Sequence, residues 1–147
     1  MEYFLSASGD MLSEESRIVE LSLMVRICIL GGDDQAAERY LKEAEDLTRA
    51  CPSDFANHYS GWARATLMAH RGETQKAAES YQRASTFTSS PDFGEFLLEY
   101  GRFQASFGDR QQAERVLHEA YATLTQLSLK PLEEAAQQAL RSIGSQA

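Results

Sequence analysis

The chain has few of the residues that characterise several protein classes. Among its 147 residues there are only two cysteines, three prolines and nine glycines. Little proline and glycine argues against disorder and against a turn-rich all-β fold. Cys28 and Cys51 lack the C-x-x-C spacing of a metal or redox site. They could form one bridge, but we expect two reduced thiols, as is usual in the cytoplasm.

Basic residues and long apolar runs are also scarce. The 14 Lys and Arg residues are outnumbered by 22 Asp and Glu residues, and the formal net charge of -8 repels phosphate backbones. The most apolar run, Ile18 to Leu30, contains Glu20 and Arg26 and is too short to span a bilayer. The first residues carry no basic segment of a secretory signal. We therefore expect a cytoplasmic protein with no nucleic-acid or membrane partner.

No pattern in the chain indicates catalysis, a metal site or a cofactor. His58, His70 and His118 lie far apart without an H-E-x-x-H companion, and we interpret each as a surface or groove-lining histidine. The glycines form neither G-x-G-x-x-G nor a phosphate-binding G-x-x-x-x-G-K-S/T loop, and no serine occupies a G-x-S-x-G turn. We predict no catalytic residues, no metal ligands and no cofactor, and expect that the protein is not an enzyme.

What the chain does contain is an internal repeat. Three segments share a Gly followed by an acidic residue, then Ala, a large apolar residue and a second Ala. They begin at Gly32, Gly72 and Gly108, which lie 40 and then 36 residues apart. The alanines and the large residues between them are Ala37, Leu41 and Ala44, then Ala77, Tyr81 and Ala84, then Ala113, Leu117 and Ala120.

The repeat predicts a pair of helices joined by a tight turn in each unit. A Gly can end one helix in the left-handed conformation, and the acidic residue after it can cap the next. Two alanines seven apart lie on one helical stripe and let a neighbouring helix approach closely. The apolar period places first helices at Glu15 to Leu30, Phe55 to His70 and Phe93 to Phe107, and second helices at about Asp34 to Ala50, Thr74 to Phe87 and Arg110 to Leu127.

Three prolines mark the joins between these units. Pro52, Pro91 and Pro131 each follow a second helix, where the scheme needs a break. After Pro131, the stretch from Leu132 to Ile143 predicts a seventh, amphipathic helix that caps the stack. We expect a loose segment over 1–14 and a single helical domain over 15–143, with units of about 15–52, 53–91 and 92–130 and a cap helix at 131–143.

The pattern resembles the tetratricopeptide repeat family from about Glu15 to Leu127. The third unit carries most of the family consensus, whereas the second has Trp62 in the aromatic place and the first has Val25 where a small residue is usual. The periods exceed the family's 34 residues, and in this they are similar to the degenerate repeats of large bacterial signalling regulators. The resemblance implies an all-α fold of three antiparallel helix pairs in a right-handed superhelix with a C-terminal capping helix. An unrelated helical bundle is the alternative.

The resemblance also implies a function. In such solenoids the first helices line a concave groove that binds a protein or peptide, so the chain would serve as an adaptor, a chaperone or the sensing segment of a larger regulator. The carboxylate-gripping set of the co-chaperone branch is missing. An enzyme or small-ligand-binding bundle with an unrecognised site is the alternative, and the oligomeric state stays open. Candidate partner-binding residues are Ser22, Arg26, Tyr59, Trp62, Ala63, Thr66, His70, Glu95, Leu98, Glu99 and Arg102; Tyr59 and Trp62 fit the core equally well.

Overall fold

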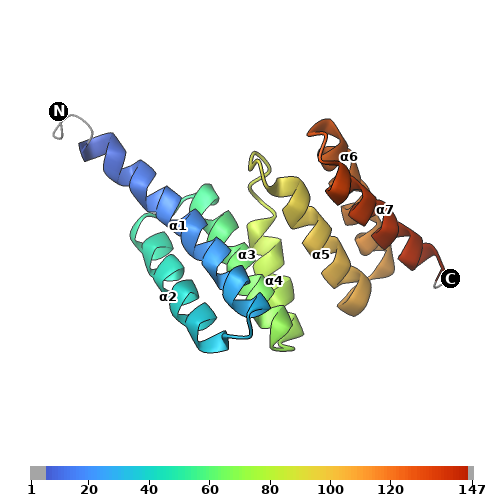
Figure 1. The fold of residues 1–147 in the computed structure, drawn as a ribbon, viewed down its shortest axis with the longest axis horizontal. Coiled ribbons are helices and arrows are strands. Elements are labelled where there is room, and N and C mark those ends of the chain that lie inside the picture. The colour runs from blue at the N-terminus through green and yellow to red at the C-terminus, as the bar shows by residue number, and fades with distance from the viewer. Residues whose placement is uncertain (1–5, 146–147) are drawn as a thin grey trace. The chain divides into compact units, whose positions relative to one another are not determined.

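The computed structural model describes the backbone of residues 6–145 and the side chains of residues 14–144. All regular structure in this range is helical, which confirms the all-α class (Figure 1). Within the same range, no helix combines the length and the apolar character needed to cross a membrane. The helices are α1 (Ser6–Leu30), α2 (Asp34–Ala50), α3 (Asp54–His70), α4 (Thr74–Ala84), α5 (Phe93–Phe107), α6 (Arg110–Gln126) and α7 (Lys130–Ser145).

Helices α1 and α4 differ from their predicted bounds by more than two residues at one end, and the other helices by two residues at most. Helix α1 begins at Ser6 instead of Glu15, so residues 6–14 are helical and not loose, while residues 1–5 lie outside the described range. Helix α4 ends at Ala84 and not at Phe87. The hydroxyl groups of Ser85 and Thr86 donate hydrogen bonds to carbonyls of the preceding turn at 2.6 and 3.1 Å. Such local bonds compete with continuation of the helix.

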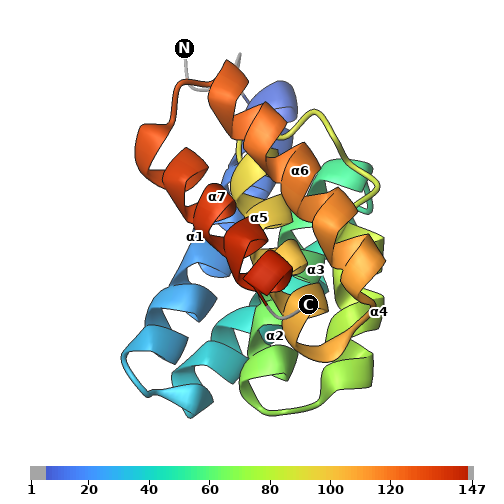
Figure 2. The ribbon, with the colours of Figure 1, turned by 90° about the vertical axis from the view of Figure 1, so that its right-hand side faces the viewer.

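The chain divides into two compact units, Met1–Phe87 with α1 to α4 and Thr88–Ala147 with α5 to α7. The sequence favours a single domain over 15–143, but the division falls just after the shortened α4. In the first unit, α1 pairs with α2 and α3 with α4, and between the pairs α3 packs more against α1 than against α2 (Figure 1). In the second unit, α5 pairs with α6, whereas α7 packs mainly against α6 and less against α5 (Figure 2).

The alanines of the repeat form the contact surfaces of the three helix pairs. All six alanines are completely buried, and the large residues between them are also buried, as the repeat predicts. Two glycines of α5 lie directly against α6. A Cβ atom added to Gly101 would lie 2.5 Å from Leu117 Cδ2, and one added to Gly94 would lie 2.9 Å from Leu124 Cδ2. Two leucines of α6 therefore fit against two glycines of α5.

The turns inside the three helix pairs are of two kinds. Gly32 and Gly72 are left-handed, with φ of 78° and 79°, as the sequence predicts. Gly108 is extended, with φ of −122° and ψ of −154°, so the prediction of a left-handed glycine is wrong for the third pair. The reason is loop length. Residues 108–109 alone separate α5 from α6, whereas residues 31–33 and 71–73 separate the first two pairs.

The acidic residues that follow these glycines cap two of the three second helices. Asp33 accepts a hydrogen bond from the Ala36 amide at 3.0 Å, and Asp109 accepts one from the Gln111 amide at 3.1 Å. Glu73 makes no side-chain cap. Its longer side chain forms an ion pair with Lys76 at 3.3 Å. The capping prediction is thus confirmed where the residue is Asp and not where it is Glu.

Candidate functional site

The candidate partner-binding residues fall into two sets, one in each unit. The first set is on α1 and α3 and the second is on α5. Because the sets belong to separate units, each set is a separate candidate surface. The first set contains Ser22, Arg26, Tyr59, Trp62, Ala63, Thr66 and His70, and the second contains Glu95, Leu98, Glu99 and Arg102.

Most of the first set is packed in the core of its unit. Ser22, Tyr59, Trp62 and Ala63 are at most 2% exposed. The Ser22 hydroxyl lies 3.0 Å from the Tyr59 carbonyl oxygen, to which it can donate a hydrogen bond across the contact between α1 and α3. Helix packing covers all four side chains, so the prediction that Ser22 and Ala63 line an open groove is wrong, and Tyr59 and Trp62 take the core position that was their alternative.

Arg26 is the charged residue that contacts this buried group. Its guanidinium carbon lies 3.9 Å from the centroid of the Trp62 ring, a cation–π contact. Its Nη1 atom is buried and has no hydrogen-bond partner among the described residues. Arg26 is half-buried, so it contributes to packing between α1 and α3 and is only partly available to a partner.

The remaining members of the first set lie further along α3. Thr66 is half-buried, and its hydroxyl donates to the Trp62 carbonyl at 2.9 Å. His70 is exposed at the end of α3, where its Nε2 lies 3.3 Å from a carboxylate oxygen of Asp34 at the start of α2. His70 is therefore engaged with the second helix of the preceding pair.

The interpretation of His58 as a surface or groove-lining residue is wrong. The side chain is completely buried, and its Nδ1 lies 2.7 Å from the Ala84 carbonyl oxygen of α4. Its ring also contacts those of Tyr59, Trp62 and Phe87, at centroid distances of 4.8 to 5.8 Å. His58 thus belongs to the packing between α3 and α4.

Most of the second set forms an exposed edge of α5. Glu95 and Arg102 are exposed, and Glu99 is half-buried. Leu98 is only 3% exposed, so its side chain is not available to a partner. Their spacing of four and then three residues places Glu95, Glu99 and Arg102 on one helical face. Arg102 forms no ion pair or hydrogen bond with any described residue.

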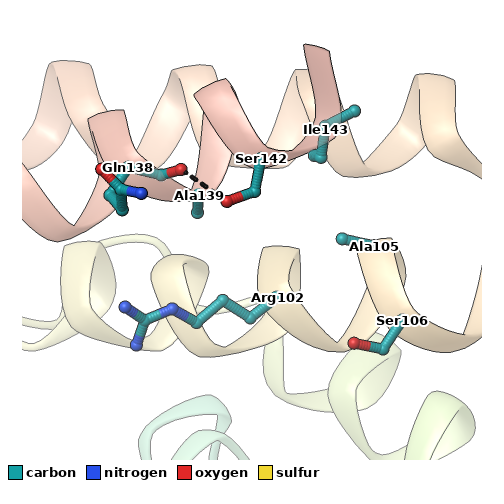
Figure 3. A pocket seen from close by; sticks show the side chains of 7 residues that line it. All are labelled: Arg102, Ala105, Ser106, Gln138, Ala139, Ser142 and Ile143. Atoms are coloured by element: carbon teal, nitrogen blue, oxygen red, sulfur yellow. Dashed lines mark hydrogen bonds between the residues drawn. The ribbon is translucent and has the colours of Figure 1, made fainter. Parts of the chain in front are cut away.

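Arg102 lines an open groove between α5 and α7 with a volume of about 680 Å³ (Figure 3). We call this the α5–α7 groove. The Arg102 side chain lies on the α5 side, and Gln138 and Ser142 lie opposite on α7, where the Ser142 hydroxyl donates to the Gln138 carbonyl at 3.0 Å. Its lining residues are Arg102, Ala105, Ser106, Gln138, Ala139, Ser142 and Ile143.

The lining of the α5–α7 groove determines the chemistry available there. Its alanines and serines are too short to bridge α5 and α7, which keeps the groove open. The guanidinium of Arg102 can bind a carboxylate with two hydrogen bonds. The serine hydroxyls and the Gln138 amide can pair with the main chain of a bound segment. The lining contains no His, Cys, Asp or Glu side chain that could serve as a general acid or base.

Cys51 is not an activated thiol. Its sulfur donates a hydrogen bond to the Glu14 carboxylate at 2.7 Å. This hydrogen bond, together with burial and the negative charge of Glu14, raises the pKa of Cys51 above its ordinary value. A nucleophilic cysteine needs a lowered pKa. Among the described residues, no cluster of three or more His, Cys, Asp or Glu side chains could hold a metal ion.

Sequence reasoning missed one surface feature of α1. Leu23, Ile27 and Leu30 are 50%, 49% and 89% exposed. They occupy positions i, i+4 and i+7, so they form one apolar stripe, which we call the α1 stripe. The spacing was visible in the sequence, but it lies beside the buried period of Leu21 and Val25, and a helix with apolar residues on two faces does not reveal which face is covered.

Comparison with known proteins gives no match. No protein-family model, curated protein or solved structure is significantly similar to the chain. The resemblance to tetratricopeptide repeats therefore rests on the residues of the repeat alone.

Proposed function

We propose that the chain is a non-catalytic interaction module that binds a peptide or protein partner in the α5–α7 groove, as an adaptor, a chaperone or the sensing part of a larger regulator. Arg102 is the observation that carries this proposal. It is an exposed cation with no partner among the described residues, and it lies where the groove is open. A carboxylate of a bound segment would pair with it.

The shape and lining of the α5–α7 groove favour a segment of polypeptide as the ligand. Sites for small molecules are mostly apolar and enclose most of the ligand. Here the groove is open along two helices, and hydroxyl and amide groups alternate with Ala105, Ala139 and Ile143. Grooves of this kind accept an amphipathic helix or an extended peptide. Glu95 and Glu99, on the same edge of α5, would favour a basic residue elsewhere in that ligand.

We further propose that the helix pairs belong to a right-handed superhelix of the tetratricopeptide type. The buried alanine pairs and the left-handed Gly32 and Gly72 support this assignment. Helix α7 departs from a regular repeat in its contacts with the preceding pair, because it packs more against the second helix, α6, than against α5, whereas α3 packs more against the first helix, α1, than against α2. We also expect the protein to act in the cytoplasm, with no nucleic-acid or membrane partner.

Affinity capture with charge-reversed variants tests the proposed function. Arg102→Glu should lose a stoichiometric protein partner that the wild-type chain retains, because the groove would then repel a carboxylate. The matched control is Arg115→Glu. Arg115 is an exposed cation of α6 that forms no ion pair with the described residues and does not line the groove. Loss of the partner from both variants, or a small molecule in place of a protein, would contradict the proposal.

A further inference from the structure

The α1 stripe is an exposed apolar surface in the unit that does not contain the α5–α7 groove. Leu30 is 89% exposed, and the exposed halves of Leu23 and Ile27 continue the surface along the helix. The stripe points away from the core of its unit, since Ile18, Leu21 and Val25 on the opposite side are at most 1% exposed. Contiguous exposed apolar side chains of this kind mark interaction sites.

The charges beside the α1 stripe are acidic. Glu20, with a side chain that is 67% exposed, lies one turn before Leu23 on the same face. Asp33 and Asp34 follow the C-terminal end of the stripe. Arg17, the exposed cation of the same helix, is shared between two carboxylates. Arg17 pairs with Glu43 at 3.0 Å and with Glu20 at 3.7 Å.

Arg26, the second cation of α1, is half-buried, and its Nη1 atom is buried. It lies one turn from both Leu23 and Leu30, but its guanidinium contacts the Trp62 ring, 3.9 Å from the ring centroid. The surface around the stripe is therefore apolar along its length and negative at its margin. A complementary partner would carry the same apolar spacing with positive flanks.

We infer that the α1 stripe binds an amphipathic helix of another protein whose apolar face is flanked by Lys or Arg residues. The three apolar side chains supply a ridge for helix packing, and Glu20 selects the charge of the flanking residues. A second copy of the chain is a poorer occupant. A twofold contact would place the stripe and its acidic margin against the same acidic margin, in a protein whose net charge is already -8.

The test uses the full chain and three synthetic helical peptides. The first has leucine at i, i+4 and i+7 with flanking lysines, the second has the same leucines with flanking glutamates, and the third has the lysines with scrambled leucines. We expect the first peptide to bind at least about tenfold more tightly than the other two, measured by fluorescence anisotropy at fixed salt. Binding of the second or third peptide as tight as the first would overturn the inference.

Two variants locate the contact. Ile27→Gln with Leu30→Gln should weaken binding of the lysine-flanked peptide by about tenfold or more, with an unchanged circular dichroism melting curve because both side chains are exposed. The matched control, Leu127→Gln with Leu129→Gln, changes two leucines of the other unit that are 48% and 40% exposed, and it should bind like the wild type. Equal weakening by the two double variants would contradict the assignment to α1.

A charge-reversed variant of Glu20 and a measurement of the oligomeric state complete the test. Glu20→Lys should weaken the lysine-flanked peptide and strengthen the glutamate-flanked one. A wild-type dimer in sedimentation that the α1 double variant dissociates would identify a second copy as the occupant and overturn the inference. Arg102→Glu should leave peptide binding to α1 unchanged, so failure here is distinguishable from failure of the α5–α7 groove.

Discussion

At the scale of single residues, left-handed backbone conformation in the turns determines where glycine is favoured over other residues. Ser128, after α6, has a φ of 56°, the left-handed region that glycine occupies at Gly32 and Gly72. The turns at Ser128 and Gly72 have the same hydrogen-bond pattern. After Ser128, the Leu129 amide donates to the Leu124 carbonyl at 3.1 Å, and after Gly72, the Glu73 amide donates to the Met68 carbonyl at 2.9 Å. A side chain at such a position costs about 1–2 kcal/mol.

Ser128→Gly is therefore predicted to stabilise the protein. We expect the free energy of unfolding in urea to rise by about 0.5–1 kcal/mol, the cost of the left-handed serine less the greater entropy of an unfolded glycine. Gly72→Ala is the converse change and should lower the free energy of unfolding by about 1 kcal/mol. A Cβ at Gly72 would meet no atom within 4 Å, so the loss would come from the left-handed backbone and not from a clash. A stabilising effect of Gly72→Ala would show that the turn is not left-handed in solution.

The environment of Cys51 predicts slow alkylation of its thiol. Only the thiolate reacts, and the hydrogen bond to Glu14 raises the pKa of Cys51 above the ordinary value of 9.0. The alkylation rate should therefore rise at a higher pH than for an ordinary thiol. Glu14→Gln removes the negative acceptor and should move the rate profile to lower pH, measured with iodoacetamide and peptide mapping. An identical profile in the two proteins would mean that Glu14 does not contact Cys51 in solution.

Not every turn conformation could be predicted from the sequence. The Gly-acidic pair identifies all three turns, but it does not distinguish the left-handed Gly72 from the extended Gly108. That difference depends on one residue of loop length, which is smaller than the uncertainty of helix ends assigned from apolar spacing. Ser128 carries no signal at all, because serine is common in turns of every type.

At the scale of helices, the contact between α5 and α6 depends on glycine. Gly101→Ala is predicted to lower the free energy of unfolding by about 1–2 kcal/mol. The added Cβ would lie 2.5 Å from Leu117 Cδ2, and overpacking of this kind costs about 1–3 kcal/mol. The higher helix propensity of alanine offsets only about 1 kcal/mol of this loss.

Gly61→Ala in α3 is the matched control for that prediction. A Cβ at Gly61 would lie 3.4 Å from Ala84 Cβ, which is close to an ordinary contact. Its free energy of unfolding should stay within about 0.5 kcal/mol of the wild type or rise through helix propensity. Equal effects of the two changes would contradict the interlocking of α5 with α6.

The sequence predicts helix bounds better than it predicts which helix faces are covered. The bounds of α2 and α5 match their predicted ranges, because a glycine or proline break flanks each helix and the apolar period is strong. The errors on α1 and α3 share one cause. Apolar spacing shows which residues share a face, but neighbouring helices decide whether that face is covered. Ser22 was assigned to an open groove and is buried, whereas Ile27 is exposed.

At the scale of the whole molecule, the repeat predicts helix pairs better than it predicts how the pairs are grouped. The three pairs are present, but the chain divides into two compact units after Phe87. The division falls in the join after α4, which ends at Ala84, and the repeat carries no information on residues between its units. The predicted groove of first helices therefore separates into surfaces that must be tested one unit at a time.

The role of the α5–α7 groove is tested most directly by isothermal titration calorimetry. The partner retained by the wild-type chain is titrated into wild-type protein, Arg102→Glu and Arg115→Glu at one fixed salt concentration. We predict that Arg102→Glu weakens binding by about tenfold or more and that Arg115→Glu stays within about twofold, because only Arg102 lines the groove. Equal loss of affinity in both variants, or full affinity in Arg102→Glu, would show that the partner binds elsewhere.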